Sequence, residues 1–336
     1  MPVRLKDIAR DLGVSVVTVS KVLRNHADIG AATRERVLKR VRELGYRPDL
    51  TARALVTGRT GLLGMVVPDL VHPFFAQVAE ALSRTLRPAG CGLVIASSGE
   101  DPELEREEIE QLTSRRVDAL LVASARTDAG ILRRLVDQKT RFILVDRRFD
   151  GFSAHYVGID NERAGSIATE HLVAQGCRRI AHIPGPPLSP AAGRLAGYRK
   201  TLARHGRSVP RGYVTERTGD VDGDAGGYAI TRRLLALKPR PDGIFCYNDP
   251  IGAGAIRAIL EAGLRIPQDV AVIGCGNVRY SDMLRVPLSS IDQDSTGIGE
   301  QAAKLALELI ASKDAVPVRT VLLEPRLVVR ASSLRR

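Results

Sequence analysis

The N-terminal segment of the chain repeats apolar side chains at the spacing of an α-helix. Positions i, i+3, i+4 and i+7 of its first stretch are Leu5, Ile8, Ala9 and Leu12. Gly13 follows, and a glycine in this place commonly ends a helix. Ser15 can then cap a second helix through its hydroxyl oxygen. The inward face of that second helix is expected to comprise Val19, Val22 and Leu23.

A third helix is predicted from about Ala32 to Leu44, ended by Gly45. Its inward positions are Val37, Leu38, Val41 and Leu44. Two short helices joined by a glycine turn are typical of a helix-turn-helix. We therefore assign residues 1–45 to a small helix-turn-helix domain.

Residues 46–60 are interpreted as a connection between domains. Asp49 can cap a helix of about two turns that runs to Gly58. So short a helix is marginal in water by itself, so we expect it to form when it docks on a partner.

From Gly61 the pattern changes to nearly continuous apolar runs that alternate with amphipathic segments. Strands are predicted to end at Val67, Ser97, Ala123, Asp146, Pro184, Tyr247 and Gly274. Helices are predicted between them over Phe75–Leu86, Arg163–Gln175, Gly193–Arg204, Tyr228–Leu237, Gly252–Ala262 and Gly299–Ile310. This alternation predicts an α/β fold with doubly wound parallel sheets.

The α/β part is long for one sheet, so we expect two lobes. One lobe is expected to contain residues 61–157 and 288–317, and the other residues 158–287 and 318–331. Loops at the carboxyl ends of parallel strands usually build the ligand site. The candidates by position are Asp69, Ser97, Ser124, Asp146, Gly185, Asn248 and Gly276.

The distribution of charge along the chain indicates a binding partner. The formal net charge is +12, and residues 1–60 alone hold 13 basic against 6 acidic residues, a net of +7. A basic excess concentrated in a small helical domain favours a polyanion such as DNA, although a solubilising surface gives the same signal.

The chemical motifs favour binding over catalysis. The stretch G252-A-G254-A-I-R257 resembles a dinucleotide fingerprint, but Arg257 occupies the place of the third glycine. The four cysteines are far apart, and the histidines lack metal-ligand spacing. No apolar run could span a bilayer, and the first residues lack the apolar core of a signal peptide. We therefore expect a cytoplasmic, nucleoid-associated binding protein without catalytic residues, cofactor, metal or membrane contact.

The second helix has an outer face that suits the major groove. Val16 and Val17 could contact thymine methyl groups there, and Lys21 could donate to guanine. Short hydroxyl side chains suited to phosphates are Ser15, Thr18 and Ser20. The plain alternative is that these are ordinary solvent-exposed helix residues.

The whole chain resembles the lac repressor (LacI/GalR) family of bacterial transcription regulators. The motifs that carry the resemblance include LKDIARDLGVSVVTVSKVL from Leu5, LGYRP from Leu44, RLAGY from Arg194 and GLRIPQDVAVIG from Gly263. It implies a DNA-binding headpiece, a hinge helix, and a core that resembles periplasmic sugar-binding proteins. It also implies a homodimer on a pseudo-palindromic operator, with a small effector between the lobes.

Position by position, the resemblance assigns base contacts to Val16, Val17 and Lys21. It implies phosphate contacts for Leu5, Ser15, Thr18, Ser20, Arg24 and Thr33. Leu55 matches a hinge leucine that is wedged into the minor groove, although it could serve hinge packing alone.

For the effector, the resemblance points to Phe74, Phe75, Asp146, Arg194 and Asn248. The two phenylalanines could equally be core residues at a helix start. Many relatives have a sugar-binding aspartate where this chain has Gly276, and Arg147 and Arg148 follow Asp146. A sugar acid is therefore a plausible effector beside a neutral sugar.

The sequence thus predicts an effector-responsive, operator-binding transcription regulator, most simply a repressor. The rival hypothesis is a small-molecule carrier or sensor without a DNA function.

Overall fold

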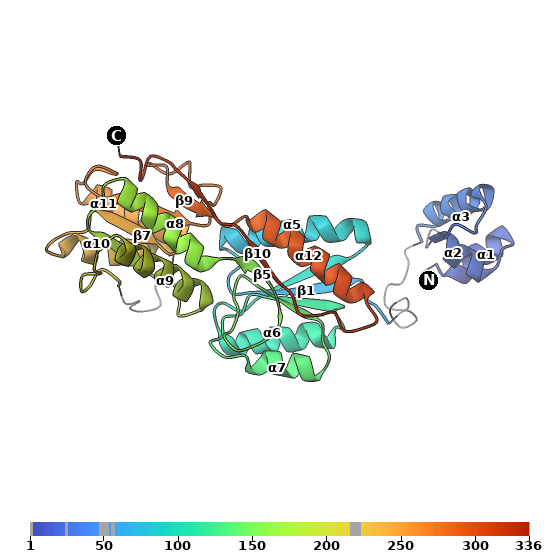
Figure 1. Cartoon of the computed structure of the whole chain (residues 1–336). Coiled ribbons are helices and arrows are strands. Elements are labelled where there is room, and N and C mark those ends of the chain that lie inside the picture. The colour runs from blue at the N-terminus through green and yellow to red at the C-terminus, as the bar shows by residue number, and fades with distance from the viewer. Residues whose placement is uncertain (1–2, 24–25, 47–53, 55–57, 216–222, 336) are drawn as a thin grey trace. The chain divides into compact units, whose positions relative to one another are not determined.

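The computed structural model describes residues 3–23, 26–46, 54, 58–215 and 223–335. The chain divides into two compact units, residues 1–60 and residues 61–336 (Figure 1). We call the first unit the headpiece and the second the core.

The headpiece packs three helices around a small apolar centre. They are α1 (Leu5–Leu12), α2 (Val16–Leu23) and α3 (Ala31–Glu43). The buried centre consists of Ile8, Ala9, Val19, Val22 and Val37. Burial of the valines of α2 outweighs their weak intrinsic preference for helix.

The ends of these helices follow the sequence signals. Gly13 adopts a left-handed backbone with φ of 65°, and its N–H donates to the carbonyl of Arg10. Ser15 Oγ accepts a hydrogen bond from the Thr18 N–H at 3.0 Å, as a capping residue does. The expected helix over 49–58 falls mostly outside the described residues. Within it, Ala54 is helical and its carbonyl accepts from Gly58 N at 2.8 Å.

The first lobe of the core is built on a six-stranded parallel sheet in the order β10-β5-β4-β3-β1-β2. Its strands are β1 (Leu62–Val67), β2 (Gly92–Ser97), β3 (Ala119–Val122), β4 (Phe142–Val145), β5 (His155–Ile159) and β10 (Thr320–Leu323). One face is covered by α5 (Pro73–Leu86) and α12 (Ser295–Ala311), and the other by α6 (Pro102–Ser114) and α7 (Gly130–Asp137) (Figure 1). A short 3₁₀ turn, η1 (Arg87–Ala89), follows α5.

The second lobe has a five-stranded sheet in the order β11-β9-β8-β7-β6, in which only the β11–β9 pair is antiparallel. Its strands are β6 (Ile180–Ile183), β7 (Gly243–Cys246), β8 (Ala271–Cys275), β9 (Ser289–Asp292) and β11 (Arg326–Val328). Its helices are α8 (Asn161–Ala174), α9 (Ser189–Arg204), α10 (Gly223–Ala236) and α11 (Asp249–Glu261).

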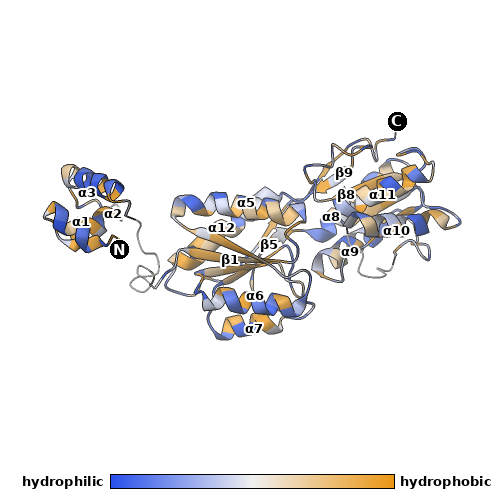
Figure 2. Ribbon diagram, turned by 180° about the vertical axis from the view of Figure 1, so that it is seen from behind, coloured by the Kyte–Doolittle hydropathy of each residue, from blue (hydrophilic) through white to orange (hydrophobic). Residues whose placement is uncertain are grey.

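Most strands of both sheets are apolar, and the helices present apolar faces to them and polar faces outward (Figure 2). In the second lobe, Ile180 and Phe245 belong to the cluster formed with α8 and α9, whereas Ala181 and Ile244 belong to the cluster formed with α10 and α11. Alternate residues of one strand therefore serve opposite layers, which explains the continuous apolar runs in the sequence.

The chain passes between the lobes three times within the described core. The crossings lie at 160, 293–294 and 324–325, between strands or helices of different lobes. The expected lobe boundaries were therefore wrong near the C-terminal end. Residues 289–292 belong to the second sheet and residues 320–323 to the first. Four short strands (β5, β9, β10, β11) and two helices (α6, α7) were also missing from the prediction.

The glycine motif at the start of α11 has a packing role. A Cβ on Gly254 would lie 1.9 Å from the carbonyl oxygen of Asp224, and one on Gly227 would lie 2.2 Å from that of Ile251. Small residues at these positions allow the close contact of α10 with α11. Arg257, which broke the fingerprint, pairs with Glu261 on the surface. The structure thus gives the motif a cause other than a nucleotide site.

None of the helices in the described part of the chain is long and apolar enough to cross a membrane.

Candidate functional site

The outer face of α2 carries apolar side chains that the headpiece core does not use. Val16 and Val17 are 44% and 61% exposed, whereas Val19 and Val22 of the same helix are buried. Packing explains the second pair and leaves the first without an internal role. A helix with such a face can contact thymine methyl groups when it lies in the major groove.

Lys21 lies one turn after Val17, and its ammonium is paired with the carboxylate of Asp28. The hydrogen bond from Lys21 lowers the pKa of the Asp28 carboxyl. Sequence reasoning did not single out Asp28, although it is an acidic residue in the loop that brings α3 back to α2. Lys21 must exchange this partner, or share it, to reach a base edge.

Most of the expected phosphate contacts that the structure describes fall at helix starts. Leu5 is the first residue of α1, Thr33 lies in the first turn of α3, and both are half-buried. Ser15 Oγ and Thr18 Oγ1 lie 2.8 Å apart at the start of α2. Ser20 is half-buried on the same helix. Arg24 and Leu55 lie outside the described residues.

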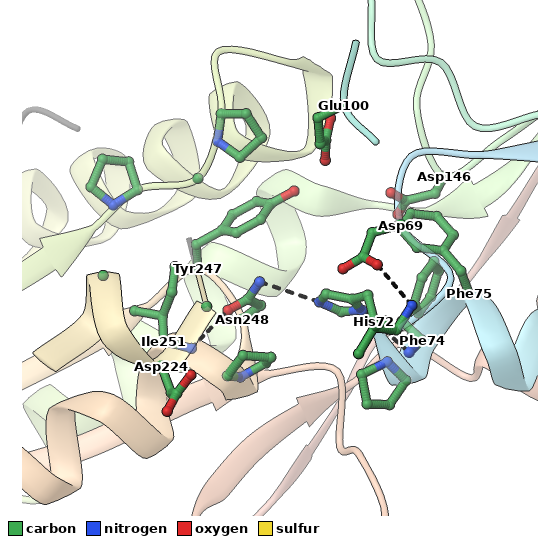
Figure 3. Close-up of a pocket in the computed structure, with 18 of the residues that line it drawn as sticks. Asp69, His72, Phe74, Phe75, Glu100, Asp146, Asp224, Tyr247, Asn248 and Ile251 are labelled. Carbon is green, nitrogen blue, oxygen red and sulfur yellow. Dashed lines mark hydrogen bonds between the residues drawn. The ribbon is translucent and has the colours of Figure 1, made fainter. Parts of the chain in front are cut away.

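A cavity of about 380 Å³ lies between the two lobes of the core. Its lining includes six of the expected effector residues, namely Asp69, Phe74, Phe75, Asp146, Arg194 and Asn248. Figure 3 labels all of these except Arg194. The size of the cavity falls in the range of small-molecule sites. These side chains meet at the cavity because they follow the carboxyl ends of strands. Asp69 follows β1, Asp146 follows β4 and Asn248 follows β7.

Three carboxylates of the first lobe line the cavity, those of Asp69, Glu100 and Asp146 (Figure 3). Asp69 Oδ1 accepts from the Val71 N–H at 2.7 Å in a tight turn. Asp146 is 5% exposed and has a left-handed backbone with φ of 64°. Burial raises the pKa of the Asp146 carboxyl, and no hydrogen bond reaches that carboxyl from the described residues. A buried acceptor that lines a cavity without a protein donor is suited to a ligand hydroxyl.

Arg194 is a framework residue as well as a lining residue. It is 2% exposed, and its guanidinium donates to Asn161 Oδ1 at 3.0 Å, Tyr247 O at 2.7 Å and Gln293 Oε1 at 2.5 Å. It also lies over the Tyr247 ring, 4.6 Å from its centroid. Three of its five N–H groups are thus committed to the protein, which leaves at most two for an effector.

Arg147 is neutralised within the first lobe. Its Nη1 and Nη2 donate to the two carboxylate oxygens of Glu100 at 2.9 and 2.7 Å. Nη1 also donates to the carbonyl of Ser124 at 3.0 Å. Such a two-point ion pair leaves little positive field for an anionic ligand.

Phe74 and Phe75 have two roles at once. Both line the cavity, and both are buried members of the core cluster on the α5 side of the sheet. Their rings meet edge to face with centroids 5.1 Å apart. The two interpretations made from the sequence are therefore not exclusive.

Ser124 and Gly276 are not part of the cavity lining. Ser124 Oγ donates to the buried carboxylate of Glu105 at 2.6 Å, away from the cavity. Gly276 sits beside Asp249, whose carboxylate accepts hydrogen bonds from Val278, Ser281 and Ser290. Both belong to structural networks that the sequence pattern could not separate from the ligand site.

His72 was missed, although it lies in the middle of the cavity wall. It caps α5 by accepting from the Phe74 N–H through Nδ1 at 3.3 Å. Its Nε2 lies 3.3 Å from Asn248 Nδ2 of the other lobe (Figure 3). Burial lowers the pKa of His72 to about 4, so the ring is neutral near pH 7. The available signal was its place before Pro73, which begins a helix near a strand end.

A helix-turn-helix unit joined to a two-lobed core with a cavity between the lobes defines a DNA-binding regulator that senses a small molecule. Comparison with known proteins agrees. Residues 4–49 match the family described as "Bacterial regulatory proteins, lacI family", and residues 169–333 match the "Periplasmic binding protein-like domain".

Relatives match over nearly the whole length of the chain. The ribose operon repressor of Escherichia coli (strain K12) is 32% identical over 334 residues, which cover 98% of this chain and 99% of that protein. The lac repressor dimer bound to operator and the anti-inducer ONPF matches with a TM-score of 0.86 and 28% identity, over 100% of both chains. The transcriptional regulator CelR in complex with cellobiose matches with a TM-score of 0.74 and 30% identity, over 98% of this chain and 99% of that one. The chain belongs to the lacI family and is a DNA-binding transcription regulator with an effector-binding core.

Proposed function

We propose that the protein is a cytoplasmic, homodimeric repressor whose effector is an uncharged carbohydrate. It binds a pseudo-palindromic operator through α2 of each headpiece. The observation that carries the effector assignment is the interlobe cavity with the buried, unpartnered carboxylate of Asp146 in its wall. Family membership, and the lac repressor dimer on its operator, support the operator and the homodimer.

The balance of charge in the cavity favours an uncharged ligand over a sugar acid. Glu100 pairs with the charge of Arg147, whose buried Nε keeps no hydrogen-bond partner among the described residues, and Arg194 is held by three acceptors of the protein. The lining then retains the carboxylates of Asp69, Asp146 and Asp224. These groups accept hydrogen bonds from sugar hydroxyls and repel a carboxylate ligand. The sugar-acid hypothesis rested on Gly276, Arg147 and Arg148. Arg147 is paired with Glu100, and neither Gly276 nor Arg148 belongs to the cavity lining.

Tyr247 and Phe75 add apolar surface to the same cavity. Sugar rings have apolar faces, and aromatic side chains in a binding site can cover them. The mixture of buried acceptors and aromatic surface therefore supports a carbohydrate more than an inorganic ion.

The effector test uses matched pairs of ligands. Thermal shift and isothermal titration are run with glucose against glucuronate, galactose against galacturonate, and with ribose and cellobiose. A bound ligand at 100 times its Kd raises the apparent stability by about 2.7 kcal/mol. Stabilisation by at least one neutral sugar and by neither acid supports the proposal. Stabilisation by the acids alone would contradict it.

On the DNA side, the full chain is tested for mobility shift against tiled fragments of its own genome. Repressor binding should be strongest on a fragment with an inverted repeat, and it should weaken steeply as salt rises. If no fragment shifts at low salt while a sugar binds, the carrier hypothesis replaces the repressor hypothesis.

Linkage connects the two sites. An effector that prefers one arrangement of the lobes shifts the population toward it, and operator affinity changes by the same coupling free energy. Measuring operator affinity with and without the bound sugar gives the sign of the effect.

A further inference from the structure

The residues that precede the strands of the first lobe lie together along one edge of its sheet. All six strands run parallel, so their amino-terminal ends meet at that edge. Backbone hydrogen bonds join the preceding segments to one another. Gly61 O accepts from the Gly92 N–H at 2.8 Å, and Leu62 O accepts from the Asp118 N–H at 2.7 Å. We call this part of the molecule the amino-terminal edge of the first lobe.

This edge is strongly basic. Its segments are 59–61, 87–91, 115–118, 138–141, 152–154 and 312–319, and they contain eight basic and two acidic residues. The basic residues, all of them exposed, are Arg59, Arg87, Arg115, Arg116, Lys139, Arg141, Lys313 and Arg319. One of the two acids, Asp118, already accepts a hydrogen bond from the Gly61 N–H at 2.8 Å.

Most of this charge is not neutralised by the protein. Arg319 pairs with Glu308 on α12. Five other cations of the edge make no ion pair with a carboxylate among the residues that the structure describes, namely Arg87, Arg115, Lys139, Arg141 and Lys313. Like charges gathered on one surface repel one another, and a polyanion bound there relieves the repulsion.

The ends of α6 and α7 give a second observation at the same edge. Arg116 and Lys139 follow these helices with left-handed backbones, at φ of 56° and 55°. The helices α8, α9 and α11 of the second lobe end with the same pair of backbone hydrogen bonds, and each has a glycine in this position. A left-handed backbone costs a residue other than glycine about 1–2 kcal/mol. A cation at a helix C-terminus regains about 0.3–1 kcal/mol, so folding alone does not explain the choice.

The connection to the headpiece begins at this edge, because residues 46–60 lead directly into β1 at Leu62. These residues can span at most about 50 Å. The carboxyl ends of both sheets face the interlobe cavity, so the corresponding edge of the second lobe lies at the opposite end of the core. That edge also has cations, but Arg179 and Arg265 are paired there with aspartates.

We propose that the amino-terminal edge of the first lobe is a second DNA-binding surface, which contacts phosphates of the duplex that the headpiece binds. Arginine and lysine side chains bind phosphate oxygens through charge and hydrogen bonds that carry no sequence information. The edge therefore adds affinity for every duplex, and the choice of operator stays with the headpiece. This inference goes beyond the proposed function and does not depend on the identity of the effector.

The test compares two variants of the full chain that lose the same charge. The edge variant combines Arg115→Gln, Lys139→Gly and Arg141→Gln, and glycine suits the left-handed backbone at position 139. The control variant carries three changes of exposed cations at the opposite end of the core, namely Arg178→Gln, Lys238→Gln and Arg240→Gln. Because all six side chains are exposed, we expect both melting temperatures to stay within about 3 °C of the wild type.

Fluorescence anisotropy measures binding to the most tightly bound genomic fragment and to a scrambled duplex of the same composition. The edge variant should bind both duplexes about tenfold more weakly, with an unchanged ratio between them. The slope of the logarithm of the binding constant against the logarithm of the salt concentration should become less steep by about 2–3 ions. The control variant should keep the wild-type affinity and slope. Equal losses in the two variants, or a wild-type slope in the edge variant, would overturn the proposal.

Lysine acetylation, followed by mass spectrometry, tests the contact directly in the wild-type chain. Binding of the duplex should slow the acetylation of Lys139 and Lys313 at least threefold and leave Lys238 unchanged. Protection of the headpiece lysines without protection of Lys139 and Lys313 rejects the second surface and retains the repressor. If the headpiece lysines also stay reactive, the chain does not bind the duplex, and the proposed function fails together with this inference.

Discussion

The headpiece surface and the core cavity are built from different kinds of sequence information. The exposed face of α2, which we expect to read DNA, comes from one helix of eight residues, and its exposed valines can be recognised from local spacing alone. The cavity draws on residues from 69 to 293 and on both lobes. The first site is therefore sensitive to single exposed side chains, whereas the second depends on a buried framework that also holds the core together.

The framework should show the largest effect. Arg194→Ala removes hydrogen bonds to Asn161, Tyr247 and Gln293 and leaves the acceptors of Tyr247 and Gln293 buried. We expect the core to lose about 4 kcal/mol of unfolding free energy in urea denaturation, with sugar binding abolished. The headpiece is a separate compact unit, so helical signal from residues 1–46 should persist in NMR spectra. A loss below 1 kcal/mol would make Arg194 a ligand contact alone.

The buried histidine of the second lobe should make the core sensitive to acid. His182 stacks on Phe245 and Tyr198, and burial lowers the pKa of His182 from 6.5 to about 4. The unfolded chain binds this proton near pH 6.5 and the folded core does not. Stability is thus complete above pH 6.5 and falls toward pH 4, by about 3 kcal/mol.

His182→Asn tests this sign. The amide can keep the hydrogen bond to the Phe245 carbonyl, which His182 Nδ1 now makes at 2.9 Å. The variant should therefore show a flatter dependence of the unfolding free energy between pH 6.5 and 4. An unchanged slope would assign the acid sensitivity to other groups.

On the headpiece, Lys21→Ala should change specificity more than stability. Its side chain lies on the exposed face of α2, and a lost base contact costs about 1–3 kcal/mol of discrimination. Mobility shifts on the selected operator and on single-base variants measure this. Equal losses on matched and mismatched duplexes would remove Lys21 from the base-reading set.

The smallest effect is expected for Asp28→Asn. It frees Lys21 and removes one negative charge beside the exposed face of α2. Affinity for unrelated DNA should rise modestly. The slope of the logarithm of the binding constant against the logarithm of the salt concentration should steepen by about one ion. Glu35→Gln is the matched control, because Glu35 is exposed on α3 and its substitution also removes one negative charge. Equal effects in both variants would mean that only net charge matters.

Sequence reasoning succeeded where the cause of a feature is local. Gly13 and Ser15 set the ends of α1 and α2, and burial of Val19 and Val22 could be inferred from spacing. The helix α6 was missed although Asp101 caps it and Pro102 begins it, both of which are readable signals. Attention to caps as well as apolar periodicity would have found it.

Other features have no local cause. Nothing near residue 289 indicates that β9 joins the second sheet, or that the chain then returns to the first lobe for α12 and β10. The pairing of Arg147 with Glu100, which changes the expected charge of the ligand, joins residues 47 positions apart. Ser124 and Gly276 follow strands, as ligand residues do. In the structure, Ser124 instead donates to the buried carboxylate of Glu105, and Gly276 lies beside the buried carboxylate of Asp249.

The three crossings also set an order of events during synthesis. The three helices of the headpiece are complete once α3 has emerged, but the sheet of the first lobe lacks an edge strand until β10 at residues 320–323 is made. At about 5–20 residues per second, the ribosome needs tens of seconds or less for the interval. Throughout that interval, the nascent chain carries a complete three-helix headpiece and an unfinished core. A messenger cut short before β9 would encode a protein that holds the headpiece and lacks the means to be released or recruited by a sugar.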